Sequence, residues 1–210
     1  MIELRTPAEI DAMRPAGRFV AEVLATLRDE THVGTNLLAI DKRAHEMIRA
    51  AGAESCYIDY HPSFGASPFG KVICTSINDA VLHGLPHDYA LRDGHPPVDR
   101  HREVERDEVA HADGYSINTD FGGHGVGRVM HGDPHVPNDG KPNRGYPLRP
   151  GLVVALEPWF LQTTDELVTD PDGWTLRSVD GSRGAHAEHT VAITADGPII
   201  LTDRSFLGVD

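Results

Sequence analysis

The stretch Val153-Val154-Ala155-Leu156-Glu157-Pro158 places a glutamate directly after four apolar residues. Such an apolar run indicates a buried strand, and a glutamate is rarely buried without a partner. A similar run, from Gly184 to Ala187, is followed by Glu188. Each carboxylate therefore needs a hydrogen-bonded cation, a salt bridge or a metal ion. The alternative is an ordinary glutamate in water at the end of a strand.

A histidine flanked by glycines lies upstream, in Gly122-Gly123-His124-Gly125-Val126-Gly127. Glycine lets the backbone turn freely and approach a ligand closely, so His124 is a candidate ligand. A loop histidine in solvent is the alternative. One imidazole and the carboxylates of Glu157 and Glu188 suit a divalent ion such as Mn, Co, Fe or Zn. Because two carboxylates neutralise one divalent ion, these residues alone predict one ion rather than two.

Local patterns predict helices near the start of the chain and strands further on. Thr6-Pro7-Ala8-Glu9 combines a capping residue, a proline at the first helical position and a glutamate that completes a capping box. Pro15 should kink or break this helix, and a second helix is expected over residues 35–51. The predicted strands are residues 72–77, 153–156, 190–194 and 199–202. Together these elements indicate an α/β (α+β) fold.

Length and composition limit the function classes. The chain has 210 residues, which fits a single domain over residues 1–210. Its formal net charge of −13 argues against nucleic-acid binding, which requires a basic face. Cys56 and Cys74 are too few for a disulfide framework, and the sequence contains neither a signal peptide nor an apolar run that could span a bilayer. A cytoplasmic protein without a membrane partner is the simplest interpretation.

Several short motifs follow one another in order over residues 1–94 and 114–202. Any one of them is weak, but the ordered set is specific. The motifs are Thr6-Pro7 with Ala16-Gly17-Arg18, Cys74-Thr75-Ser76-Ile77-Asn78-Asp79, Val81-Leu82-His83-Gly84-Leu85-Pro86, Gly123-His124-Gly125-Val126-Gly127-Arg128, Leu148-Arg149-Pro150-Gly151, Leu156-Glu157-Pro158, Asp172-Gly173-Trp174-Thr175 and Glu188-His189-Thr190-Val191. In this order they resemble type I methionine aminopeptidase.

The resemblance implies the pita-bread aminopeptidase fold, a curved antiparallel sheet with flanking helices. It also implies an active site with two divalent metals, which two aspartates, one histidine and two glutamates hold. His124 would be the histidine ligand. Glu157 would be a ligand and the general base for the attacking water, and Glu188 would bridge the metals.

The resemblance also assigns residues to the substrate, which would be an N-terminal methionyl peptide or a nascent chain. His83 would contact the scissile amide, and His131 would steady the tetrahedral intermediate. The pocket for the methionine side chain would be formed by Cys74, Trp174 and either Phe64 or Phe69.

The chain departs from the family pattern after Asp93-Gly94. Family members continue with a strand that carries the first ligand aspartate and a hairpin that carries the second. Here His95-Pro96-Pro97 follows at once, and the pattern resumes only at Tyr115. Both ligand aspartates are therefore missing, and the sheet should be truncated in its middle, with an atypical junction over residues 95–113. Asp99 is the nearest substitute ligand, and unpaired strand edges would favour a homo-oligomer.

Two functions remain open at this point. The first is metal-dependent removal of N-terminal methionine, impaired by the loss of the two aspartates. The alternative is a non-catalytic homologue that binds peptide N-termini or a protein partner. A third interpretation is a decayed gene product. The predicted site residues argue against it, because all of them are intact: His83, His124, His131, Glu157 and Glu188.

Overall fold

The computed structural model describes residues 2–62, 67–93, 114–141 and 144–207. Its internal contacts divide the chain into two compact units. The first unit takes its described residues from Met1–Glu22, His101–Phe160 and His186–Asp210, and the second from Val23–Arg100 and Leu161–Ala185. The single domain over residues 1–210 stays a prediction. The atypical junction over residues 95–113 lies outside the described residues.

Helix α1 (Pro7–Glu30) begins with the predicted capping box. The carboxylate of Glu9 accepts hydrogen bonds from the backbone N and the Oγ1 of Thr6, at 2.8 and 2.9 Å, and the backbone N of Glu9 donates to Thr6 Oγ1 at 3.2 Å. These bonds satisfy N–H groups that would otherwise stay unpaired at the start of the helix. The helix does not break at Pro15 but continues through it. Burial of apolar residues on both sides, such as Ile10 and Ala21, outweighs the one hydrogen bond that proline removes.

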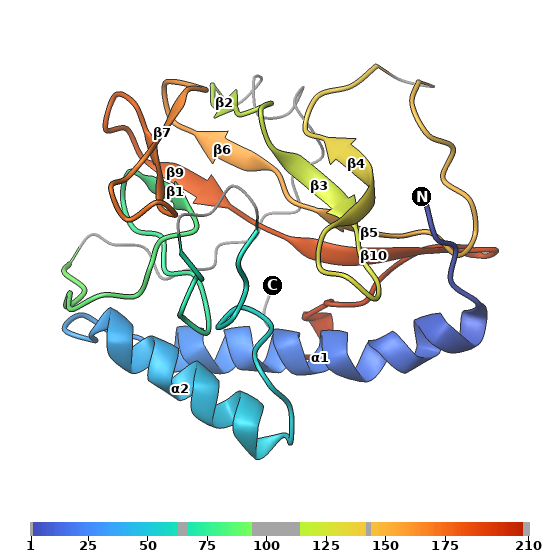
Figure 1. The fold of residues 1–210 in the computed structure, drawn as a ribbon, viewed down its shortest axis with the longest axis horizontal. Helices are drawn as coiled ribbons and strands as arrows, with labels where there is room; N and C mark the ends of the chain where they lie inside the picture. Colours follow the sequence, from blue (N-terminus) through green and yellow to red (C-terminus); the bar gives the residue numbers. More distant parts are fainter. Residues whose placement is uncertain (1, 63–66, 94–113, 142–143, 208–210) are drawn as a thin grey trace. The chain divides into compact units, whose positions relative to one another are not determined.

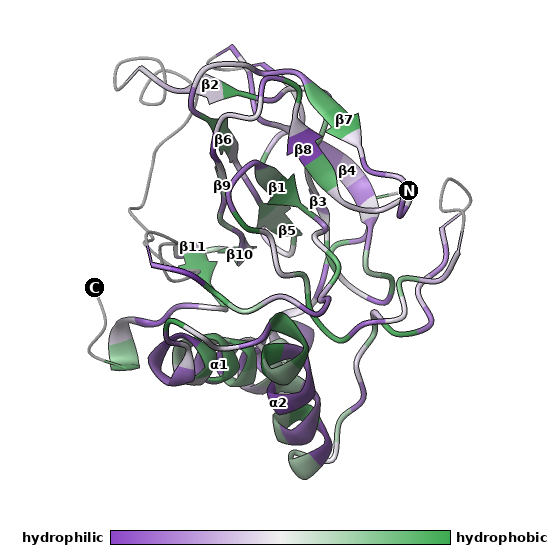
Figure 2. Ribbon diagram, turned by 90° about the vertical axis from the view of Figure 1, so that its left-hand side faces the viewer, coloured by the Kyte–Doolittle hydropathy of each residue, from purple (hydrophilic) through white to green (hydrophobic). Residues whose placement is uncertain are grey.

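Helix α2 (Leu37–Ala50) lies in the second unit, close to the predicted range. The side chain of Asn36 caps it by accepting a hydrogen bond from the backbone N of Leu38 at 2.9 Å. Hydrophobic and hydrophilic residues alternate along this helix, as Figure 2 shows, and the buried ones are Leu37, Ile40 and Ala44. Gly52 follows with a φ of 72°, a conformation that favours glycine and ends helices.

The first unit is built on a five-stranded antiparallel sheet (Figure 1). The strands, in spatial order, are β11 (Gly197–Ile200), β10 (His189–Thr194), β5 (Val153–Leu156), β3 (Gly122–Gly125) and β4 (Gly132–Pro137). The predicted strands at 153–156 and 190–194 are confirmed. The strand predicted at 199–202 lies two residues earlier, because Gly197 to Ile200 pair with Val191 to Thr194 across a tight turn.

One core cluster of the first unit joins this sheet to the start of α1. Ile10 of α1 packs against Val153, Ala192 and Leu201, and all four are buried. Apolar burial of this kind is the main favourable term in folding. The cluster therefore fixes β5 and β10, whose ends carry the predicted metal ligands.

The second unit contains a three-stranded antiparallel sheet in the order β1 (Ala80–Leu82), β8 (Leu176–Ser178) and β7 (Leu167–Thr169). The strand predicted at 72–77 is wrong, because β1 begins only at Ala80. The backbone N–H groups of Val72 and Ile73 donate to Asp41 Oδ1 at 2.8 and 3.1 Å, so a side chain satisfies them instead of a strand partner.

The chain passes between the two units within α1, within β6 (Trp159–Leu161) and within β9 (Gly184–His186). The last two strands pair with β2 (Ser116–Ile117) in the order β2-β6-β9. A short 3₁₀ helix, Ser205–Leu207, lies near the C-terminus. None of the helices in the described part of the chain combines the length and the hydrophobicity that a membrane crossing requires.

Candidate metal centre

The three predicted ligands come together in the first unit. His124 lies in β3, Glu157 directly follows β5, and Glu188 lies between β9 and β10. Because β5 pairs with both β3 and β10, these positions are neighbours although they are far apart in sequence. One ligand atom from each side chain lies within 4.8 Å of the other two.

The glycines around His124 are needed for close contact between strands. A Cβ at Gly123 would collide with the carbonyl oxygen of Ala155, and one at Gly125 with that of Asp133. The absence of both side chains lets β3 lie tightly against its neighbours. His124 is therefore a half-buried residue of a strand and not a loop histidine in solvent.

Glu157 is the buried member of the group, with 8% of its surface exposed. Its Oε1 lies 3.3 Å from His124 Nε2. Its Oε2 accepts a hydrogen bond from Trp159 Nε1 at 3.2 Å and lies 3.4 Å from His186 Nε2. Burial acts to raise the pKa of Glu157, but the contacts with His186, Trp159 and His124 bring this pKa below its ordinary value. The carboxyl group is thereby kept ionised.

Glu188 keeps an exposed surface, although neighbouring atoms crowd its carboxyl group. This crowding, and then the negative charge of Glu157, raise the pKa of Glu188. Since Glu188 is exposed, its carboxyl group retains much of its hydration, which weakens the effect of crowding on the pKa. We therefore attribute the raised pKa mainly to repulsion between the carboxylates of Glu188 and Glu157. A cation between them would remove this repulsion.

His131 lies beside His124, with ring centroids 4.3 Å apart. The residue as a whole is exposed, yet crowding of its ring by neighbouring atoms, and then the charge of His124, lower the pKa of His131. A neutral imidazole at neutral pH can both donate and accept a hydrogen bond. The structure thus brings His131 to the predicted ligand group.

The donor set fits a divalent cation. It offers one imidazole nitrogen and two carboxylates, the ligand types that Zn²⁺ and similar ions take in proteins. In a tetrahedral centre with bonds of about 2.1 Å, neighbouring ligand atoms lie about 3.4 Å apart. The 3.3 Å between His124 Nε2 and Glu157 Oε1 matches this spacing. Three protein ligands would leave a coordination position open for water, as catalytic zinc centres do.

An aromatic cluster forms in the second unit around Trp174. The ring of Phe69 lies 5.2 Å from that of Trp174, and Tyr60 and His83 lie 6.2 and 6.3 Å away. Phe69 and Trp174 are buried. The buried Nε1 of Trp174 has no hydrogen-bond partner among the described residues.

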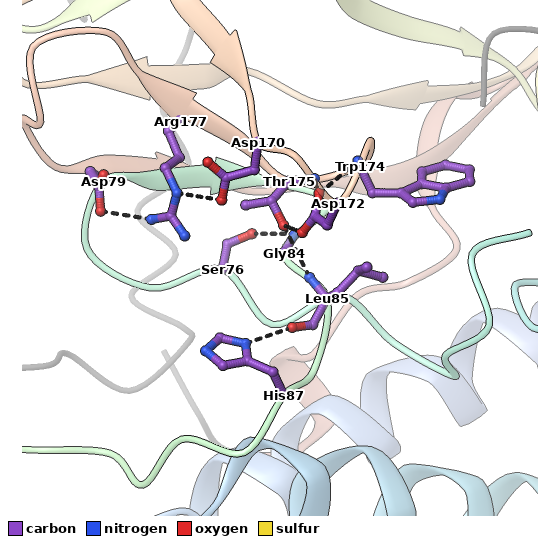
Figure 3. A network of polar contacts seen from close by, with 10 residues as sticks. All are labelled: Ser76, Asp79, Gly84, Leu85, His87, Asp170, Asp172, Trp174, Thr175 and Arg177. Carbon is purple, nitrogen blue, oxygen red and sulfur yellow. Dashed lines mark hydrogen bonds and ion pairs between the residues drawn. The ribbon is translucent and has the colours of Figure 1, made fainter. Parts of the chain in front are cut away.

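The turn between β7 and β8 holds Trp174 in place (Figure 3). Asp172 Oδ1 accepts hydrogen bonds from the backbone N of Trp174 and of Thr175, both at 2.8 Å, and its Oδ2 accepts one from Thr175 Oγ1 at 2.6 Å. Beside this turn, Arg177 donates to Asp170 at 2.6 Å and to Asp79 at 2.9 Å. These contacts fix the backbone on both sides of the tryptophan.

His83 adopts a backbone conformation that residues other than glycine rarely adopt. Its φ is 53°, in the left-handed region, directly after β1. Residues held in this way cost about 1–3 kcal/mol each and gather at functional sites. The conformation agrees with a special role for His83, whose ring stands nearly perpendicular to that of Trp174, at 86°.

Comparison with known proteins identifies the family. A profile of metallopeptidase family M24 matches residues 11–98 and 101–195. The chain belongs to this family.

The M24 chain is similar to methionine aminopeptidases of bacteria. "Methionine aminopeptidase 1" of Mycobacterium tuberculosis is 34% identical over 259 positions, which cover 96% of this chain and 95% of that protein. The crystal structure of methionine aminopeptidase from Rickettsia prowazekii has a TM-score of 0.87 at 27% identity and covers 97% of this chain and 100% of its own. That from Thermotoga maritima has a TM-score of 0.84 at 28% identity, with the same coverage. The predicted pita-bread fold is confirmed.

The alignment also measures what this M24 chain lacks. It has 259 positions, whereas the whole chain has 210 residues, so at least 49 positions of the Mycobacterium tuberculosis protein have no counterpart here (259 less 210). The family match is interrupted between residues 98 and 101. Both observations agree with the predicted internal deletion.

The predicted site residues of this M24 chain divide between the two units. His124, His131, Glu157 and Glu188 gather in the first unit, whereas His83 and Trp174 meet in the second. Cys74 is half-buried in the second unit, and its part in the substrate pocket stays a prediction. Of the two alternative pocket residues, Phe69 contacts Trp174, and Phe64, like Asp99, lies outside the described residues.

The sequence analysis did not predict two residues that contact the candidate site residues. The first is His186, which lies against Glu157. The second is Tyr60, which joins the aromatic cluster. An alternation in the sequence could have indicated His186: it precedes Glu188 by two residues, and residues two apart on an extended chain face the same side.

Proposed function

We propose that this M24 chain is a metal-dependent aminopeptidase that removes N-terminal methionine from peptides and nascent chains. The observation that carries the proposal is the gathering of His124, Glu157 and Glu188 within 4.8 Å. The names of the relatives support the choice of substrate.

In this proposal His124, Glu157 and Glu188 would hold one divalent ion, Mn, Co, Fe or Zn. When bound, such an ion lowers the pKa of water and polarises a peptide carbonyl. Glu157, whose lowered pKa keeps it ionised, accepts a proton from the attacking water as the general base. His131 donates a hydrogen bond to the charge that develops on the carbonyl oxygen.

The second unit supplies the groups proposed to recognise the substrate. Trp174, Phe69 and Cys74 accept the methionine side chain, since a thioether makes favourable contacts with aromatic rings. The strained His83 contacts the scissile amide. The turn around Asp172 keeps Trp174 in position for this contact.

One ion is favoured over two by charge. Two carboxylates neutralise one divalent ion, and a second ion would need further anionic ligands. We therefore expect turnover to be weaker than in two-metal members of the family. The alternative, a non-catalytic homologue that binds peptide N-termini or a protein partner, is favoured by the absence of at least 49 positions that the Mycobacterium tuberculosis relative has.

The test is hydrolysis of the peptide Met-Ala-Ser by the purified protein, with Mn, Co or Fe added in turn and with EDTA. We expect release of methionine that requires metal. Glu157→Gln removes the base while it keeps the side-chain shape, so it should lower kcat/KM by about 100-fold or more.

Glu54→Gln is the matched control, because the Glu54 side chain is 84% exposed, pairs with Arg49 at 2.8 Å and belongs to the second unit, whereas Glu157 belongs to the first. This variant should keep the wild-type rate. A folded, monodisperse protein that releases no methionine with any of the ions would exclude the enzyme and leave the binding homologue.

A further inference from the structure

The two oxygens of the Glu157 carboxylate have different neighbours. Oε1 faces the ligand His124 at 3.3 Å. Oε2 faces away from that contact, accepts a hydrogen bond from Trp159 Nε1 at 3.2 Å and lies 3.4 Å from His186 Nε2. The carboxylate therefore has one side toward the candidate metal and one side toward a tryptophan and a histidine.

His186 is held firmly beside this second oxygen. It is the last residue of β9, and its side chain is 18% exposed. Its ring stands edge-on to Trp159, with centroids 5.9 Å apart and an interplanar angle of 87°. The distance of 3.4 Å to Glu157 permits a charge contact, but the buried Nε2 lacks a partner in hydrogen-bond geometry within the described structure. Leaving a buried polar atom without a hydrogen bond is costly, and the Glu157 carboxylate, 3.4 Å away, would satisfy this nitrogen if the contact shortened.

His186 is better placed to orient a ligand than to be one. The group whose ligand atoms lie within 4.8 Å of one another contains His124, Glu157 and Glu188 but not His186. Three protein ligands already equal the number found in catalytic zinc centres. Residues that contact the outer side of a ligand carboxylate fix its orientation and tune the affinity for the metal.

We propose that His186 is a positioning residue, which together with Trp159 holds Oε2 of Glu157 so that Oε1 is presented to the metal. This inference rests on the proposed function, since it requires an ion at the centre. Contacts that are long without ligand commonly tighten in the bound state, and the 3.4 Å contact of His186 is of this kind.

The test measures the affinity of the full chain for Co²⁺, by visible absorption titration and by calorimetry. His186→Leu keeps much of the side-chain volume but removes the nitrogen, and it should weaken Co²⁺ binding by about 10–100-fold. His186→Gln keeps an N–H donor and should bind within about threefold of wild type, as a positioning role predicts. His45→Leu is the matched control, because His45 is an exposed histidine on α2 of the second unit, whereas the proposed ligands belong to the first; the affinity of this variant for Co²⁺ should not change.

The outcomes separate the inference from the proposed function. Wild-type protein that binds no Co²⁺ overturns both. Wild type that binds, with His186→Leu equally tight, overturns the inference alone. Equal weakening in His186→Leu and His186→Gln also overturns it, because a metal ligand cannot be rescued by an amide donor. Circular dichroism checks each variant, and if His186→Leu does not fold, His186→Ala replaces it with the same expected loss.

Discussion

At the scale of a single residue, the charge of Glu188 has two opposite effects. It lowers the stability of the metal-free protein, but it would help to bind the metal ion. The pKa of Glu188 is raised in the folded protein, so folding favours the neutral carboxyl group. The resulting cost is absent below the unfolded pKa of about 4.3 and is complete once the pH exceeds the raised folded value. We therefore expect Glu188→Gln to raise the Tm of the metal-free protein at pH 7, by roughly 1–2 °C because the exposed surface screens the charge.

The measurement is thermal unfolding in EDTA at pH 7 and at pH 4. The gain of Glu188→Gln should shrink at pH 4, where the raised pKa keeps the wild-type carboxyl group mostly protonated in the folded protein. With Co²⁺ the order should reverse, since the variant lacks a proposed ligand. A lower Tm for Glu188→Gln in EDTA at pH 7 would contradict the assigned repulsion.

The sequence indicated the chemistry of single residues more readily than their partners. A glutamate after an apolar run, as at Glu157, needs compensation wherever it lies, and this reasoning led to the ligand group. The contact between His186 and Glu157 depends on how distant strands align, which no local pattern encodes. Backbone strain at His83 was invisible for the same reason: it arises from packing around the residue and not from its type.

At the scale of elements, the turn between β7 and β8 should limit substrate recognition. Asp172→Ala removes three hydrogen bonds that hold Trp174 and Thr175, and it should cost about 1 kcal/mol, since Asp172 is exposed. Burial acts to raise the pKa of Asp172, but hydrogen bonds from Thr175 and Trp174 lower it overall. This contribution is thus present above the unfolded pKa of about 3.9 and is lost as the pH falls through the folded value.

Urea unfolding at pH 7 and pH 3 measures this effect, and peptide kinetics measure the second consequence. If Trp174 contacts methionine, Asp172→Ala should raise KM more than it lowers kcat. Asp59→Ala, at an exposed residue of the same unit, should change neither quantity. An unchanged KM in a destabilised Asp172→Ala protein would show that the turn matters for folding only.

Elements were predictable where their determinants are local. The capping box at Thr6 and Glu9 lies within four residues, and the structure reproduces it. The apolar run at 72–77 has the composition of a strand, but a strand requires a partner, and Asp41 takes the backbone donors of Val72 and Ile73 instead. The strand propensity of these residues was thus outweighed by hydrogen bonds to a side chain some thirty residues earlier in the sequence.

At the scale of the whole molecule, metal should stabilise the protein by mass action. A free Co²⁺ concentration 100 times the Kd should add about 2.7 kcal/mol and raise the Tm by roughly 5–10 °C. Because His124, Glu157 and Glu188 all belong to the first unit, metal binding should stabilise that unit directly. Calorimetry with and without EDTA therefore also tests the predicted single domain: one transition that shifts as a whole supports it, and two transitions of which one shifts contradict it.

Neither unit is a continuous piece of chain. The first unit consists of three segments of the chain, and segments of the second unit separate them. The first segment contains the start of α1, and the last contains β10 and β11. During synthesis, which adds about 5–20 residues per second, α1 leaves the ribosome before its packing partners in β5 and β10 have been made. The central strand β5 gains its neighbour β10 only after more than thirty further residues have been added, and Glu188 arrives at the same time. Synthesis that stops before that point would leave a chain whose helix lacks its packing partners, whose sheet has an open edge and which carries two of the three ligands, a species for chaperones or proteases to remove.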